Sequence, residues 1–175
     1  NIGGDDVVIG ISASGNTPFT HSVVQSSKAS GALTIAVTSN PRSCLAETAH
    51  YVIATETGAE VLAGSTRLGA GTAQKAALNA FSTVLMTNLG RVLGNEMLCV
   101  QATNKKLKLR QARILAKNVD DMSEHQAYQL LQSVSWNLRV AFLVSLGLSE
   151  SEALEEIRAE VPFKQLFESL KTKLG

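Results

Sequence analysis

The sequence predicts an α/β fold with a doubly wound parallel sheet, followed by a small all-helical tail. Three short apolar runs alternate with helical segments in the first half, and helical periodicity dominates the second half. Strands that alternate with helices imply right-handed parallel crossovers. Because three strands make a thin open sheet and the chain begins at Asn1 rather than Met, we expect further strands upstream.

The strands are predicted from continuous runs rich in β-branched residues, which are typical of strands buried on both faces. Pro18 stands at a first helical position with Thr17 as its N-cap, so a helix is expected from there to about Ser30. A short helix is expected within residues 43–49. The three strands are expected at residues 7–11, 33–38 and 51–55.

A glycine-rich loop at residues 57–71 is followed by a long helix predicted over residues 72–93. Its apolar residues recur at helical spacing, and Gly94 with Asn95 ends it.

The remaining segments are predicted from helix caps. Asn104 caps a basic helix, and Ser123 and Ser149 each open a capping-box pattern. A last amphipathic segment covers residues 163–174. We place the domain boundary so that residues 1–118 form the α/β part and residues 119–175 the helical domain.

Composition excludes several classes of function. The net charge of +1 does not favour nucleic-acid binding, and no apolar run is long enough for a membrane span. Cys44 and Cys99 match no metal spacing and are interpreted as buried free thiols of a cytoplasmic protein. No spacing of the histidines suggests a metal site either.

The turn at residues 12–17 (SASGNT) is the first candidate site, because it joins a strand to a helix. Its hydroxyl groups, backbone amides and helix N-terminus are what a phosphate group requires. Gly15 lets the backbone approach a ligand closely. The alternative is an ordinary strand-to-helix turn with a good cap.

The glycine-rich loop is the second candidate, and it carries Glu60 and Arg67. Glu60 could accept hydrogen bonds from sugar hydroxyls or act as a base. The alternative is a structural role, with the carboxylate bound to Arg67 or to backbone amides. Ordinary exposed or core roles are expected for the histidines at positions 21, 50 and 125 and for the basic run at residues 105–110.

Two stretches carry a resemblance to a known family. Residues 11–18 (ISASGNTP) and residues 57–75, extended through residues 79–104, resemble the signature shared by N-acetylmuramic acid 6-phosphate etherases and the glucokinase regulatory protein. The resemblance implies a SIS domain, with the last three of five parallel strands present in this chain. It also implies a homodimer, a phosphorylated amino sugar as substrate, and no metal or organic cofactor. Composition already argues against nucleic acid and membrane as partners.

The resemblance assigns the substrate-binding residues position by position. The turn that binds the sugar phosphate corresponds to Ser12, Ser14, Gly15, Asn16 and Thr17. The glutamate that contacts sugar hydroxyls corresponds to Glu60, with Ser65, Thr66 and Arg67 shaping the pocket. The family's catalytic glutamates lie upstream of the first strand, so the catalytic residues are unknown from this chain.

Two departures from the family pattern leave alternatives open. Asn16 stands where etherases carry arginine, and Gly69 stands where they carry lysine. The leading hypothesis is a carbon–oxygen lyase that yields N-acetylglucosamine 6-phosphate and D-lactate in cell-wall amino sugar recycling. The alternatives are a non-catalytic sugar-phosphate sensor and a sugar-phosphate isomerase.

Overall fold

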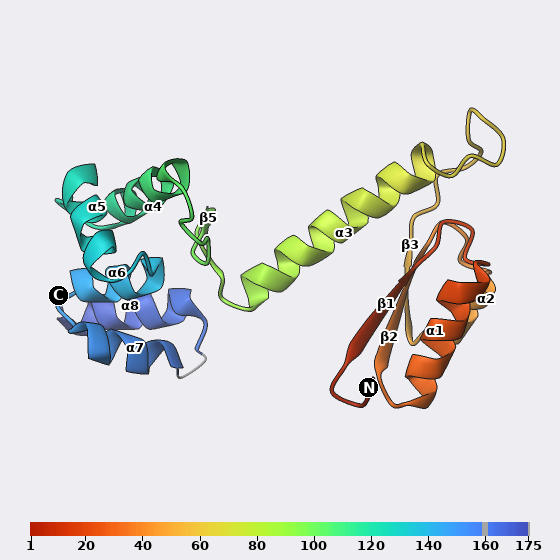
Figure 1. Cartoon of the computed structure of the whole chain (residues 1–175), viewed down its shortest axis with the longest axis horizontal. Coiled ribbons are helices and arrows are strands. Elements are labelled where there is room, and N and C mark those ends of the chain that lie inside the picture. The colour runs from red at the N-terminus through yellow and green to blue at the C-terminus, as the bar shows by residue number, and fades with distance from the viewer. Residues whose placement is uncertain (159–160, 175) are drawn as a thin grey trace. The chain divides into compact units, whose positions relative to one another are not determined.

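The structure, a computed structural model, describes residues 1–158 and 161–174 (Figure 1). Its internal contacts divide the chain into one unit ending at Ser82 and a second beginning at Thr83. The division falls within helix α3 (Gly69–Asn88). We describe each unit by itself.

The first unit contains a three-stranded parallel sheet in the order β1-β2-β3, as the sequence predicts. In this sheet Ile9 pairs with Ile35, and Ile35 pairs with Tyr51. Helices α1 and α2 lie against the sheet (Figure 1). The bounds are β1 (Val7–Ile11), α1 (Pro18–Ala29), β2 (Leu33–Thr38), α2 (Cys44–Thr48) and β3 (Tyr51–Ala54).

Both of these helices pack on the same face of the sheet. Val24 of α1 and Leu45 of α2 are fully buried, and a Cβ added at Gly10 of β1 would lie 2.5 Å from Val24 and 3.2 Å from Leu45. On the opposite face β1 is open to solvent, with Val7 56% and Ile11 45% exposed. Burial of β1 on both faces was therefore a wrong prediction for these described residues.

Helix α3 begins and ends earlier than the sequence predicts, at Gly69 and Asn88. The segment expected to finish it forms instead an antiparallel hairpin of β4 (Val92–Leu93) and β5 (Glu96–Met97). Gly94 has a φ of +59° and supplies the left-handed backbone of the hairpin turn.

In the described part of the second unit, five helices pack around one apolar core. Phe142 lies at its centre without solvent exposure, and its ring centroid is 5.9 Å from that of Phe163 and 5.2 Å from that of Phe167. The helices are α4 (Lys105–Asn118), α5 (Glu124–Ser133), α6 (Leu138–Ser145), α7 (Glu150–Arg158) and α8 (Phe163–Leu174).

The predicted caps of these helices are confirmed. Asn104 Oδ1 accepts a 3.0 Å hydrogen bond from Leu107 N–H, and Ser123 and Ser149 form the two capping boxes. Residues from α4 through α8 share one core cluster. The domain boundary expected at residues 118–119 stays a prediction.

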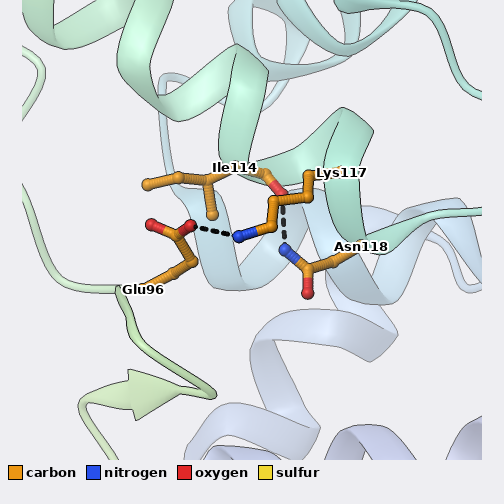
Figure 2. Close-up of polar contacts among 4 residues, drawn as sticks. All are labelled: Glu96, Ile114, Lys117 and Asn118. Carbon is orange, nitrogen blue, oxygen red and sulfur yellow. Dashed lines mark hydrogen bonds and ion pairs between the residues drawn. The ribbon is translucent and has the colours of Figure 1, made fainter.

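An ion pair joins the hairpin to α4. Lys117 Nζ lies 2.9 Å from Glu96 Oε1, and the next residue, Asn118, donates from its side chain to the Ile114 carbonyl at 2.8 Å (Figure 2). The side chain of Glu96 is 20% exposed, so this pair is better shielded from water than the other ion pairs of the described residues.

The interpretation of the cysteines as buried thiols was wrong. Cys44 at the start of α2 and Cys99 after β5 are both exposed. The described part of the chain contains no group of three or more His, Cys, Asp or Glu side chains placed to hold a metal ion. Among the same residues, no helix is both long and apolar enough to cross a membrane.

Candidate functional site

The turn between β1 and α1 is tied to the neighbouring strand by backbone hydrogen bonds. Ser12 N–H donates to the Val37 carbonyl at 3.0 Å, and Ser39 N–H donates to the Ala13 carbonyl at 3.0 Å. Ser12 itself is buried, and its hydroxyl lies 2.8 Å from the hydroxyl of Thr17 and accepts from Gly15 N–H at 3.1 Å. Ser12 therefore shapes the turn from inside.

Gly15 is required at its position by two independent constraints. Its φ of +70° lies in the left-handed region, and a Cβ there would collide with the side chain of Ser43 and lie 2.8 Å from Thr38 Oγ1. Its carbonyl accepts from Leu45 N–H at 3.1 Å. This close approach docks the start of α2 against the turn.

The N-terminus of α1 is left without a side-chain acceptor. Thr17 occupies the N-cap position with extended backbone, yet its hydroxyl makes no cap hydrogen bond and contacts Ser12 instead. Pro18 has no N–H, and the first amides of any helix lack partners within the helix. The positive end of α1 is thus available to an anion.

Exposed polar groups surround this helix end. Ser14, Asn16 and Thr17 are all exposed. Ser14 Oγ accepts from Asn16 N–H at 3.3 Å, and Asn16 Oδ1 accepts from Cys44 N–H at 3.4 Å. These contacts pre-position the Ser14 hydroxyl and the Asn16 amide while leaving the Asn16 NH₂ group free of hydrogen bonds within the described residues.

Sequence reasoning missed two hydroxyl residues at the same edge of the sheet. Ser39 follows β2 and Thr55 follows β3, and their hydroxyl oxygens lie 3.2 Å apart. Ligands of open parallel sheets bind at the carboxyl ends of the strands. Ser39 directly follows the strand predicted at residues 33–38, and Thr55 is the last residue of the strand predicted at residues 51–55. These positions were the signal that could have identified them.

Glu60 is bound to the backbone at the start of α3. Its two carboxylate oxygens accept from Gly69 N–H and Ala70 N–H, both at 2.9 Å. These two hydrogen bonds, that from Ala70 first, hold the pKa of Glu60 below its ordinary value of 4.5. Binding to backbone amides is one of the alternatives that the sequence left open for this residue.

The other residues assigned to the loop are less constrained. Ser65 N–H donates to the Leu62 carbonyl at 2.9 Å, and the Thr66 carbonyl accepts from Gly71 N–H at 2.9 Å. Arg67 is exposed and forms no hydrogen bond or ion pair with any described residue. Its guanidinium is therefore free to meet a ligand.

One backbone carbonyl connects the two candidate regions. The Val37 oxygen accepts from Ser12 N–H and also from Gln74 Nε2 at 3.3 Å, which ties α3 to the carboxyl end of β2. Gln74 is buried, so this contact is shielded from water. No hydrogen bond among the described residues joins Glu60 directly to the turn at residues 12–17.

The chain is similar in sequence to known proteins. Residues 1–84 match the SIS domain family. The chain is 42% identical to an N-acetylmuramic acid 6-phosphate etherase of Staphylococcus saprophyticus over 87% of its length, and 40% identical to those of Deinococcus radiodurans and Escherichia coli over 90%. It spans about half the length of these curated relatives, 52–53%.

A solved structure, described as that of a hypothetical protein, superposes on 50% of this chain. The superposition covers 50% of that structure's chain, with 25% sequence identity and a TM-score of 0.43.

Proposed function

The chain carries a SIS domain and is related to the N-acetylmuramic acid 6-phosphate etherases along about nine tenths of its length, and we propose that the whole protein is such an etherase. The reaction is a carbon–oxygen lyase reaction that yields N-acetylglucosamine 6-phosphate and D-lactate. A cytoplasmic homodimer is part of the same proposal.

The observation that supports it best is the free N-terminus of α1. The phosphate of the sugar binds the unpaired amides of the first helical turn, and the hydroxyls of Ser14 and Thr17 donate to its oxygens. The hydroxyls of Ser39 and Thr55 at the neighbouring strand ends face the polar part of the sugar.

Glu60 takes the role of a positioning residue in this proposal. Each oxygen of an ionised carboxylate has two acceptor sites, and one site on each oxygen is used by the α3 amides. The remaining sites accept hydrogen bonds from sugar hydroxyls, with Ser65, Thr66 and Arg67 forming the pocket wall. The lowered pKa of Glu60 keeps the group ionised, which suits an acceptor better than a general acid.

The chemical step follows the elimination and hydration route that the resemblance implies. A base removes the C2 proton, lactate leaves C3 with a proton from an acid, and water then adds to the double bond. The acid and base glutamates belong to a part of the family sequence upstream of the matched region. The described residues therefore supply binding and orientation.

A second candidate is a sugar-phosphate sensor without catalysis, and two positions favour it. Asn16 and Gly69 stand where the etherases carry cations. A Cβ at Gly69 would lie 3.3–3.5 Å from the Glu60 carboxylate oxygens, so a lysine there would place its charge beside Glu60. The loss of both cations weakens anion attraction.

The decisive experiment measures D-lactate release from N-acetylmuramic acid 6-phosphate by the full-length product of the parent gene. Release supports the etherase. If a folded protein releases no D-lactate but still binds N-acetylglucosamine 6-phosphate, the sensor becomes the preferred assignment.

Under either assignment, Ser14→Ala should raise the dissociation constant of the sugar phosphate about tenfold or more, since a hydrogen bond to a charged group contributes about 1.5–3 kcal/mol. Unchanged affinity would show that Ser14 does not belong to the site.

A further inference from the structure

The second unit contains two hollows that share part of their walls. One measures about 580 Å³ and the other about 520 Å³, and Arg91 and Arg139 line both. Arg158 lines the second. We call the two hollows together the arginine groove. Their volumes fall in the range of small-molecule sites, which is about 300–1,000 Å³.

The arginine groove concentrates positive charge in a chain whose net charge is only +1. Within residues 1–158 and 161–174, its lining includes three arginines and no aspartate or glutamate. Arg139 and Arg158 form no hydrogen bond or ion pair with a described residue, and the only such partner of Arg91 is the Cys99 sulfur at 3.5 Å.

Some other cations of this unit have carboxylate partners within the fold. Lys117 pairs with Glu96 (Figure 2), and Arg113 lies 3.4 Å from Glu124. Arg139, by contrast, is half-buried and has no carboxylate partner among the described residues. Partial burial of an unpaired charge costs free energy, and a bound anion would offset that cost.

The walls of the arginine groove are built by close packing. Gly90 has a φ of +67°, and a Cβ at this residue would lie 2.8 Å from the Cα of Pro162. This contact holds the end of α3 against the segment before α8. Asn137 Oδ1 caps α6 by accepting from Val140 N–H at 3.3 Å, which sets the first turn that carries Arg139.

Strained backbone forms part of the wall of the first hollow. Ser135 and Trp136 have φ values of 53° and 62°, which are uncommon for residues other than glycine. Trp136 is held by an edge contact with Tyr128 at 4.9 Å and by Lys108 Nζ at 4.7 Å from its ring. Strain of this kind clusters at ligand sites.

We propose that the arginine groove binds the phosphate group of a small phosphate monoester. Guanidinium groups are planar donors that match phosphate oxygens in pairs, and three of them from three segments suit a doubly charged ion better than a single carboxylate. Gln101, Thr103 and Ser135 line the first hollow and meet the polar remainder of the ligand. This site uses residues of the second unit alone and does not depend on the proposed function.

The test uses the chain's single tryptophan as a local reporter, because Trp136 lines the groove. Inorganic phosphate, and then glucose 6-phosphate, is titrated at constant ionic strength against chloride. We expect a saturable change in the indole N–H chemical shift and in the fluorescence of Trp136. Arg139→Met should raise the dissociation constant about tenfold or more.

Matched variants separate the groove from the turn at residues 12–17. Arg113→Met removes an exposed arginine outside the groove lining and should leave the dissociation constant read from Trp136 unchanged. Ser14→Ala weakens binding at the turn only, so the value read from Trp136 should stay the same. Arg91→Met and Arg158→Met provide the same test at exposed positions if Arg139→Met fails to fold.

Three outcomes would overturn the proposal. The first is the absence of a saturable response of Trp136 to either phosphate compound. The second is an equal loss in Arg139→Met and Arg113→Met, which would indicate unspecific attraction. The third is saturation by acetate or citrate without saturation by phosphate, which would assign the groove to carboxylates.

Discussion

The N-termini of α1 and α3 lie in the same unit, but they differ in whether a side chain accepts hydrogen bonds from their first amides. Both helices follow loops rich in glycine and hydroxyl residues. At α1 the cap residue Thr17 turns its hydroxyl toward Ser12, and no side chain accepts from the first amides. At α3 the carboxylate of Glu60 accepts from both Gly69 N–H and Ala70 N–H.

This difference shows that a favourable helix N-terminus is not by itself a ligand site. The carboxylate of Glu60, nine residues before Gly69 in the chain, already occupies the positive end of α3. The end of α1 has no anion within the fold, so it can take one from solution. Occupancy by a side chain, rather than loop composition, distinguishes the structural end from the binding end.

The largest expected effect comes from Gly15→Ala, which overpacks the turn that precedes α1. The new Cβ would collide with Ser43 while the backbone stays left-handed, so the free energy of unfolding should fall by roughly 2–5 kcal/mol in urea titrations. Gly58→Ala is the matched control, because its φ is +71° with no atom within 4 Å of the added Cβ. Equal losses in the two variants would contradict the close approach.

A smaller effect is expected from Thr17→Asp, which gives α1 an anion of its own. The carboxylate should cap the helix and repel a second anion, raising the dissociation constant for N-acetylglucosamine 6-phosphate about tenfold or more while the melting temperature holds or rises. Thr17→Asn keeps the cap without the charge and should bind more tightly than Thr17→Asp. Similar weakening in both variants would argue against an electrostatic cause.

The smallest effect is expected from Glu60→Gln, and it appears as a change with pH. The folded-state pKa of Glu60 is lowered, so its stabilisation is present above the ordinary value of 4.5 and is lost as the pH falls through the folded value. Between pH 7 and pH 3 the unfolding midpoint of the wild type should therefore fall further than that of Glu60→Gln. Parallel pH profiles would show that Glu60 is not held ionised by α3.

Elements specified by local patterns were predicted closely from the sequence. The predicted bounds of β1, β2 and α8 agree with the structure. The apolar runs of the two strands, and the amphipathic run of α8 after a proline, begin and end where these elements begin and end. The start of α3 was missed because Gly69, Ala70 and Gly71 have weak helix propensity as a group. Their helical backbone depends on the contact with Glu60, which no local window contains.

In the candidate site too, residues within a local pattern could be predicted, whereas residues brought together by the fold could not. Gly15 and its neighbours are recognisable because strand, turn and helix are contiguous there. Ser39 and Thr55 join the same edge only through parallel pairing of three strands, and a rule about strand ends was needed to select them. The exposed positions of Cys44 and Cys99 depend on how α2 and the hairpin pack, which composition does not encode.

The open face of β1 has a practical consequence for handling the protein. β1 is an outer strand of the described three-stranded sheet, and its Val7 and Ile11 side chains are about half exposed. An unpaired apolar strand edge recruits further strands and promotes self-association. Preparations of this 175-residue chain should therefore become turbid at high concentration, and a lysine at position 7 or 11 should keep them clear.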